Sequence, residues 1–414
     1  MKEYIARAEK IRERINELAS ISEEAMCITR TFGTDAFLAG SCKVRSWMEA
    51  AGLETRVDNI GNVRGKLASK HPAAKTFVIA SHIDTVVNAG KFDGPLGVLI
   101  GLDVVEKIFF YRDTLPFHIE LIAFSDEEGI RFHTTFLGSK VVAGSFDKSL
   151  LQKKDASGTT LNAVIQKMGG DPERLHQDAI QPQDWLAYFE MHIEQGPVLY
   201  KQNIPVAVVT AIAGQKRIEV RFKGMAGHAG TVPMDMRRDA LCCASEFVLE
   251  VEKFGLANKE KIVATVGKLQ VAHAASNVIP GEVACTLDLR SADKTTLDAS
   301  YKSLQKMCAS ICNKRSIHFE WNLVQETDPV TCDQQMNKWL CQAIETAGYE
   351  VVKLVSGAGH DAVPVSKVAP VALLFVRCFE GISHNPLEDV ELNDIAVAIE
   401  VADQFIHYLI HHNQ

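Results

Sequence analysis

Short apolar runs that end in histidine or carboxylate motifs are the feature that most constrains the fold of this 414-residue chain. Residues 76–80, 119–124 and 373–376 are largely apolar and of strand length, the pattern of strands buried on both faces. Polar motifs flanked by glycine follow most of these runs. Open α/β sheets place their active sites just past the carboxyl ends of buried strands. The sequence therefore predicts an α/β fold with a functional site at one edge of a sheet.

Length and composition narrow the class of protein. A chain of this length exceeds a single compact core, so two domains are expected. The net charge of -8 argues against a nucleic-acid partner and permits a small-molecule substrate. No apolar run approaches the ~20 residues that cross a bilayer, and the charged start lacks the apolar core of a signal peptide. Ten cysteines without a framework spacing indicate thiols in a reducing compartment. We therefore expect a cytoplasmic protein that binds no membrane.

The pattern of strands and helices predicts where the domains begin and end. Apolar strands, glycine-rich loops and amphipathic helices alternate over residues 76–145, as in βαβ units. From about residue 213 the strands alternate polar and apolar residues, which is typical of half-exposed strands. The order strand–helix–strand–strand–helix–strand over 213–328 predicts a small ferredoxin-like α/β sandwich. We expect a main domain at 1–212 and 329–414, interrupted by an inserted domain at 213–328.

Histidines and carboxylates without cysteine among them are the ligands expected for a pair of hydrolytic divalent metals. The candidates are His82, Asp93, Glu127, Glu128, His192 and His384. Because Glu127 and Glu128 are adjacent, we expect one to ligate and the other to stay free as a general base. The spacing alone leaves open which does which. Asp84, two residues beyond His82, is expected to share its face of the strand and to orient it.

Other classes of site are less well supported. A serine hydrolase is disfavoured because no Gly-x-Ser-x-Gly elbow occurs. The segment 357–359 resembles a phosphate-binding loop only faintly, since it lacks Gly-Lys-Ser/Thr and is followed by His360 and Asp361. A lone histidine is more often structural than a ligand. Five ligands are expected when only one glutamate of the adjacent pair is counted, and each stands at a strand end or tight loop. This coincidence favours the metal site over a non-enzymatic binding module.

These motifs, in this order, resemble the M20 family of metal-dependent amidohydrolases and peptidases, and within it the amidase, hydantoinase and carbamoylase branch. The motifs are 80–84, with alanine in place of the family's glycine, 92–99, 126–132 and 192–196. The resemblance implies a zinc-peptidase-like α/β catalytic domain with an inserted lid and dimerisation domain. It implies two divalent metal ions per subunit, with zinc, manganese or cobalt as candidates. The implied ligands are His82, Asp93, Glu128, His192 and His384, with Asp93 bridging and Glu127 as the catalytic base.

Further motifs at 212–217, 227–234, 275–281, 287–290 and 356–362 resemble the members of this branch that act on allantoate. The resemblance implies that Arg217, Asn277 and Arg290 contact the substrate, with Gln195 as a further contact. It also implies that His228 binds substrate and assists catalysis from the lid, across a homodimer. Allantoate carries a carboxylate and two ureido arms, which suit a guanidinium and an amide side chain.

The expected reaction is hydrolysis of one ureido C–N bond of allantoate, giving ureidoglycine, ammonia and CO₂ in purine nitrogen catabolism. The alternatives on the same scaffold are an N-carbamoyl-L-amino-acid hydrolase and a ureidoglycolate amidohydrolase. A more distant alternative is a catalytically inactive binding homologue, although no metal ligand is missing from the sequence.

Overall fold

The structure is a computed structural model that describes residues 1–413. It divides into two compact units, unit 1 with Met1–Thr210 and Cys332–Gln414, and unit 2 with Ala211–Thr331. The domain limits expected from the sequence, at 212/213 and 328/329, lie two to three residues from these break points. Among the described residues no helix has the length and apolar character needed to span a bilayer. All ten cysteines are free thiols.

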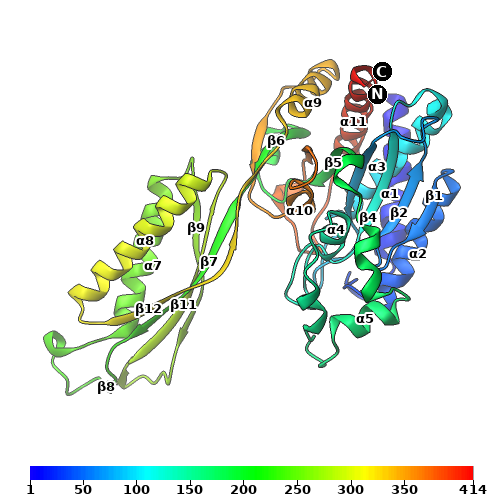
Figure 1. Cartoon of the computed structure of the whole chain (residues 1–414). Coiled ribbons are helices and arrows are strands. Elements are labelled where there is room, and N and C mark those ends of the chain that lie inside the picture. The colour runs from blue at the N-terminus through cyan, green and yellow to red at the C-terminus, as the bar shows by residue number, and fades with distance from the viewer. Residues whose placement is uncertain (414) are drawn as a thin grey trace. The chain divides into compact units, whose positions relative to one another are not determined.

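The larger sheet is mixed and has the strand order β1-β2-β4-β3-β5-β15-β6-β13, with β14 paired to β6. Figure 1 labels β1, β2, β4, β5 and β6 of this sheet. The four strands β4, β3, β5 and β15 are neighbours and run parallel. Their side chains are almost wholly buried, as the apolar runs predict. The carboxyl ends of these four strands therefore meet at one edge. The strands are β1 Glu54–Val57, β2 Val63–Leu67, β3 Thr76–His82, β4 His118–Phe124, β5 Trp185–Ile193, β6 Val206–Ile212, β13 Val330–Thr331, β14 Lys353–Ser356 and β15 Val371–Val376.

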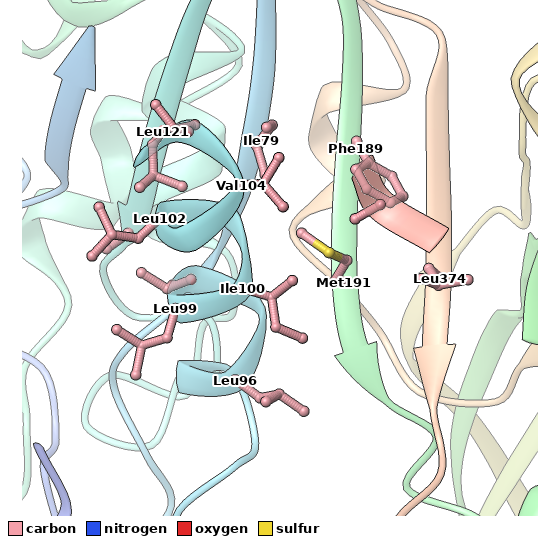
Figure 2. Close-up of a cluster of buried hydrophobic side chains, with 14 of the residues drawn as sticks. Ile79, Leu96, Leu99, Ile100, Leu102, Val104, Leu121, Phe189, Met191 and Leu374 are labelled. Carbon is pink, nitrogen blue, oxygen red and sulfur yellow. The ribbon is translucent and has the colours of Figure 1, made fainter. Parts of the chain in front are cut away.

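Helix α3 (Pro95–Ile108) is the central helix of unit 1, and it packs on β3 and β5. Figure 2 shows Ile100 of this helix beside Met191 of β5 in the apolar core. Gly97 permits the close approach, because a Cβ at this position would lie 1.9 Å from the carbonyl oxygen of Met191. The other helices of unit 1 are α1 Lys2–Ala19, α2 Asp35–Ala50, α4 Leu137–Val142, α5 Leu161–Lys167, α6 Val198–Gln202, α9 Gln334–Thr346, α10 Ala362–Val365 and α11 Leu392–His412.

Short 3₁₀ helices lie in the connecting segments. Residues 151–185 contain α5 and parts or all of three such helices. The 3₁₀ helices are η1 Phe109–Thr114, η2 Lys148–Gln152, η3 Pro172–Asp178, η4 Pro182–Asp184, η5 Met234–Met236 and η6 Phe379–Gly381.

Unit 2 contains a four-stranded antiparallel sheet of order β12-β7-β11-β9 and two helices. Apart from β8 and β10, which form a separate two-stranded sheet, the order along the chain is β7, α7, β9, β11, α8, β12, so the predicted strand–helix–strand–strand–helix–strand pattern is confirmed. Ile218, Val220 and Phe222 alternate along β7 and pack in the core beside the helices. The elements are β7 Gly214–Lys223, β8 Gly227–His228, α7 Ala240–Ala257, β9 Val263–Val271, β10 Val278–Ile279, β11 Glu282–Ser291, α8 Lys294–Lys314 and β12 His318–Thr327.

Candidate active site

The predicted ligands of unit 1 gather at the carboxyl edge of the four parallel strands. His82 is the last residue of β3, and His192 lies near the end of β5. Glu127 and Glu128 follow β4, whereas His384 lies in the loop after β15. Asp93 comes just before α3 and completes the set. The parallel arrangement thus brings together residues that lie up to about 300 positions apart in the sequence.

The side chains form two groups that share Asp93. The ligand atoms of His82, Asp93 and His192 lie within 4.8 Å of one another, and so do those of Asp93, Glu128 and His384. The Nε2 atom of His192 is 3.2 Å from Asp93 Oδ1, whereas that of His384 is 3.0 Å from Asp93 Oδ2. His384 Nε2 also lies 3.3 Å from Glu128 Oε1. Each oxygen of Asp93 therefore belongs to a different group, as a bridging carboxylate requires.

The donor and acceptor chemistry of the first group fits a cation. His82 Nδ1 lies 3.1 Å from the main-chain oxygen of Asp84, and His192 Nδ1 lies 3.0 Å from that of Ile193. These contacts place the ring proton on Nδ1 and leave both Nε2 atoms as acceptors, 3.4 Å apart. The buried Oδ1 of Asp93 accepts no hydrogen bond from the described residues. The two Nε2 atoms and this oxygen are thus three hydrogen-bond acceptors that face one another with no donor between them, an arrangement that fits a divalent metal.

The electrostatics of the second group, Asp93, Glu128 and His384, also favour a positive charge between the two carboxylates. Burial alone would raise the pKa of Asp93, but the hydrogen bond from His384 and nearby imidazoles hold it well below its ordinary value. Hydrogen bonds to Asp93 and then Glu128 raise the pKa of His384 to about 10. The carboxylate of Asp93 is thus stabilised by cationic neighbours, a role that a metal ion can also fill.

Asp84 connects the loops that follow β3 and β4. Its Oδ1 accepts a hydrogen bond from the backbone N–H of Glu127, and its Oδ2 accepts one from that of Glu128, both at 3.1 Å. Strand β3 ends at His82, so Asp84 reaches this histidine from the following loop rather than along one face of the strand. The same residue therefore orients His82 and fixes the backbone of both glutamates.

Glu127 lies beside the ligand groups without being needed in either. It is buried, and its carboxyl lies close to His82 and Glu128. Burial raises the pKa of Glu127 well above its ordinary value, and the negative charge of Glu128 adds to the shift. A raised pKa makes a carboxylate a better proton acceptor. Asp126, with a φ of 53°, turns the chain so that both adjacent glutamates follow β4 into the site.

Gln195 contacts a predicted metal ligand. Its Nε2 donates a hydrogen bond to Asp93 Oδ2 at 2.9 Å, and it lies 3.3 Å from the hydroxyl of Ser383. Both Gln195 and His384 have a φ of 55°, so the backbone is turned sharply at each. The contacts of Gln195 in the structure are with Asp93 and Ser383, and its contact with substrate stays a prediction.

Sequence reasoning missed several buried polar residues near this edge. His360 packs against His192, with ring centroids 4.7 Å apart, and Glu190 joins them in a further possible ligand group. Ser383 and Glu388 contact Asp93 or its loop. Glu190 could have been noticed from sequence, because a charged residue inside the largely apolar strand β5 is unusual. No local signal distinguishes Glu388 from a surface residue.

The expected substrate residues of unit 2 fall into two sets. Arg217 and Arg290 lie on β7 and β11 and both contact Asp288, at 3.4 Å and 2.8 Å. Lys216 points to the opposite, helix-covered face, where Asp298 of α8 and Glu326 hold its ammonium group. Of the adjacent pair Lys216 and Arg217, only the arginine lies on the same face as Asp288 and Arg290.

His228 and Asn277 form the second set. They lie on or beside the two-stranded ribbon of β8 and β10, where the backbone N–H of Ala229 donates to the carbonyl of Asn277 at 2.9 Å. Both side chains are exposed. His228 Nδ1 accepts a hydrogen bond from the backbone N–H of Gly230 at 3.0 Å, which leaves Nε2 to carry the ring proton as a donor.

Comparison with known proteins identifies the family. Residues 78–408 match the family model described as Peptidase family M20/M25/M40. The chain belongs to this family. It is 39% identical to an allantoate deiminase of Arabidopsis thaliana, over 93% of this chain and 79% of that protein. It is also 36% identical to an N-carbamoyl-L-amino acid amidohydrolase of Geobacillus stearothermophilus, over 95% of this chain and 96% of that protein.

A solved structure supports the same assignment. The chain resembles an amidase of the hydantoinase/carbamoylase family from Burkholderia multivorans with a TM-score of 0.90 and 33% identity, over 97% of this chain and 98% of that one. The predictions of family and fold class, and of a hydrolase, are confirmed. The family and the clustered ligands together support divalent metal ions as cofactors.

Proposed function

We propose that this protein is a metal-dependent amidohydrolase that cleaves a ureido C–N bond of allantoate, giving ureidoglycine, ammonia and CO₂. The observation that carries the chemistry is the meeting of two ligand groups on Asp93, with the carboxyl of Glu127 beside them. His82, Asp93 and His192 would hold one metal, and Asp93, Glu128 and His384 the other. Nitrogen and oxygen ligands suit zinc, manganese or cobalt. When bound, such metals polarise a carbonyl and lower the pKa of water.

The protein side chains would carry the proton transfers. Glu127 would take a proton from the attacking water as its oxygen bonds to the ureido carbon, and would pass that proton to the leaving nitrogen as the C–N bond breaks. The products are an amine and carbamate, which decays to ammonia and CO₂. Asp84 would hold the backbone of Glu127 and of Glu128, so that one glutamate can act as the base while the other binds metal. The Nε2–H of His228 would donate to the oxyanion that develops on the ureido carbonyl.

Allantoate is favoured as the substrate by similarity and by charge. Two soybean proteins named allantoate deiminase, 38% and 37% identical to this chain, add to the Arabidopsis relative. The guanidinium groups of Arg217 and Arg290, with Asn277 and Gln195, would bind the carboxylate and the ureido arms. An N-carbamoyl-L-amino acid is the second candidate, because relatives named for that substrate reach 37% identity. Ureidoglycolate remains a third.

We also propose that residues 213–328 act as a lid and dimerisation domain of a cytoplasmic homodimer. Support for dimerisation comes from β9, an edge strand of the unit 2 sheet that exposes Val263 and Leu269. Exposed apolar side chains on an edge strand are typical of a surface that another chain covers.

Ammonia release from metal-reconstituted protein tests the proposed function. The substrates are allantoate, ureidoglycolate and several N-carbamoyl-L-amino acids, compared by kcat/KM. The highest value with allantoate would support the substrate assignment. Faster turnover of an N-carbamoyl-L-amino acid would overturn the substrate and leave the mechanism standing. No ammonia from any of them, in protein shown to hold two metals, would indicate an inactive binding homologue.

A further inference from the structure

Glu388 is a buried carboxylate in the loop after β15 that the sequence analysis did not select. Its Oε1 accepts hydrogen bonds from the backbone N–H groups of Phe92 at 2.7 Å and Asp93 at 3.1 Å. The side chain is 3% exposed. A single carboxylate oxygen thus satisfies two consecutive amides of the loop that presents the shared ligand, almost 300 positions earlier in the sequence.

The second oxygen of Glu388 connects to the other side of the centre. The hydroxyl of Ser383 lies 3.2 Å from Glu388 Oε2 and 2.9 Å from Asp93 Oδ2. Ser383 directly precedes His384, the predicted ligand on the opposite side of Asp93. Through its two oxygens, Glu388 therefore contacts the backbone of one predicted ligand and the residue next to another.

Gly90 shows that the loop is shaped around this carboxylate. A Cβ at Gly90 would lie 2.3 Å from both the Cδ and Oε1 atoms of Glu388. Real Cβ atoms do not approach other atoms so closely, so any larger residue must push Glu388 or its own loop aside. The glycine provides an observation that is independent of the hydrogen bonds and points to the same close contact.

We propose that Glu388 is a positioning residue for the metal centre. It clamps the loop that carries Asp93 to the loop that carries His384, so that the carboxylate of Asp93 can serve both ligand groups. This inference rests on the proposed function, in which Asp93 bridges two metals. Groups that orient ligands in this way commonly contribute 10- to 100-fold to metal affinity.

A purely structural role makes a different prediction. Asp178 is also a buried carboxylate that accepts a hydrogen bond from a backbone N–H, that of Asn59 at 2.9 Å, but it holds no predicted ligand. If Glu388 only satisfies buried amides, its loss should resemble the loss of Asp178 and lower stability alone. If it positions Asp93, its loss should weaken metal binding in protein that remains folded.

The test measures zinc affinity of metal-free protein by competition with a chromophoric chelator, with folding followed by circular dichroism and thermal unfolding. Glu388→Met should weaken the binding of at least one zinc by roughly 10- to 100-fold. Glu388→Gln should stay within about threefold of wild type, because its amide oxygen can accept both N–H groups and its nitrogen can donate to Ser383. Gly90→Ala should act in the direction of Glu388→Met. The control Asp178→Leu should keep wild-type zinc affinity.

The outcomes separate this inference from the proposed function. A wild-type protein that binds no zinc would contradict the metal centre itself. Wild-type zinc affinity in folded Glu388→Met, or a loss in Glu388→Gln as large as that in Glu388→Met, would overturn the clamp while leaving the centre intact. Should Glu388→Met not fold, Gly90→Ala decides, because it displaces the carboxylate without removing it. Unchanged zinc affinity in that variant would also overturn the inference.

Discussion

The two units hold their predicted functional side chains in different ways. In unit 1, the Nε2 atoms of the predicted ligands His192 and His384 lie 3.2 Å and 3.0 Å from the two carboxylate oxygens of Asp93. In unit 2, by contrast, Arg217 and His228 are exposed, and Arg217 and Arg290 share the carboxylate of Asp288. The first set stands at strand ends and in the loops that follow them. For the second set, we propose that a substrate carboxylate would replace Asp288 as the partner of the two arginines.

This difference agrees with what we propose that each set binds. A metal ion needs several ligands at short distances, so their order must be built into the fold. A substrate carboxylate can displace an internal one, since both make the same charge-assisted hydrogen bonds with a guanidinium. Asp288 therefore occupies the kind of position that we propose for a substrate carboxylate. Variants of each set should accordingly change different measured quantities.

The largest expected effect is on turnover and tests the buried set. Glu127→Gln should lower kcat by about 10²-fold or more, because the amide cannot accept a proton from water. The variant should retain its metals, since neither shared-Asp93 group includes Glu127. Steady-state ammonia release and metal analysis of the same sample provide the measurement.

Glu128→Ala is the matched control for that prediction. It should reduce metal content, because Glu128 belongs with Asp93 and His384. Two full metal equivalents in Glu128→Ala would mean that the roles of the adjacent glutamates are reversed. Activity close to wild type in metal-loaded Glu127→Gln would remove the general base from the mechanism.

The next effect tests the exposed set. Arg290→Ala should remove a charge-assisted contact of about 1.5–3 kcal/mol, which lowers kcat/KM by roughly 10- to 150-fold. Metal content should stay the same, because Arg290 belongs to unit 2 and none of the candidate ligands does. Kinetics over a range of allantoate concentrations would check this. Loss of metal or of folded protein, in place of a kinetic change, would contradict a substrate role.

The next prediction is a partial recovery of activity in mixed dimers, which would place His228 across a homodimer. Glu127→Gln and His228→Ala homodimers should each be nearly inactive, whereas a denatured and refolded mixture should regain activity. About half of a random mixture is heterodimer with one intact site of two, so about a quarter of wild-type activity is expected. Subunit exchange is verified by native mass spectrometry. If exchange occurs without any recovery, His228 acts within its own chain or only in the structure.

The smallest effect sharpens the comparison within unit 2. Lys216→Met should leave KM for allantoate within about twofold of wild type, because Asp298 and Glu326 hold the ammonium group on the helix-covered face. Lys216 is buried, but methionine keeps its apolar stem and both carboxylate partners are well exposed, so the free energy of unfolding should fall by no more than about 1 kcal/mol. Chemical denaturation and initial-rate kinetics measure the two quantities. A large rise in KM would place Lys216 with Arg217 as a substrate residue.

Much of the fold and part of the site could be predicted from sequence because the relevant signals are local. Buried parallel strands leave continuous apolar runs, and the runs at β3, β4 and β15 indicated the central strands directly. The period-2 alternation of β7 indicated the half-exposed sheet of unit 2. Short polar motifs after strand ends then indicated His82, Asp93 and the two glutamates.

Other features had no local signal. The contact between Lys216 and its two carboxylates depends on which face of β7 the helices cover, and the alternation by itself does not say which face that is. Glu190 and His360 are buried beside His192 only because β5 and the loop before α10 pack together. Glu388 directly follows a turn at Pro386 and Leu387, a context that favours an exposed side chain.

The sequence by itself determined the kinds of side chain available for chemistry and the strand ends at which they stand. Periodicity and motif spacing are properties of neighbouring residues, so one chain suffices to read them. Only the tertiary structure decided that the two oxygens of Asp93 face different histidines, and that Asp84 and Glu388 hold the loops around them. Those relations join residues from about 40 to nearly 300 positions apart. They follow from the order of strands in the sheet, which no local pattern specifies.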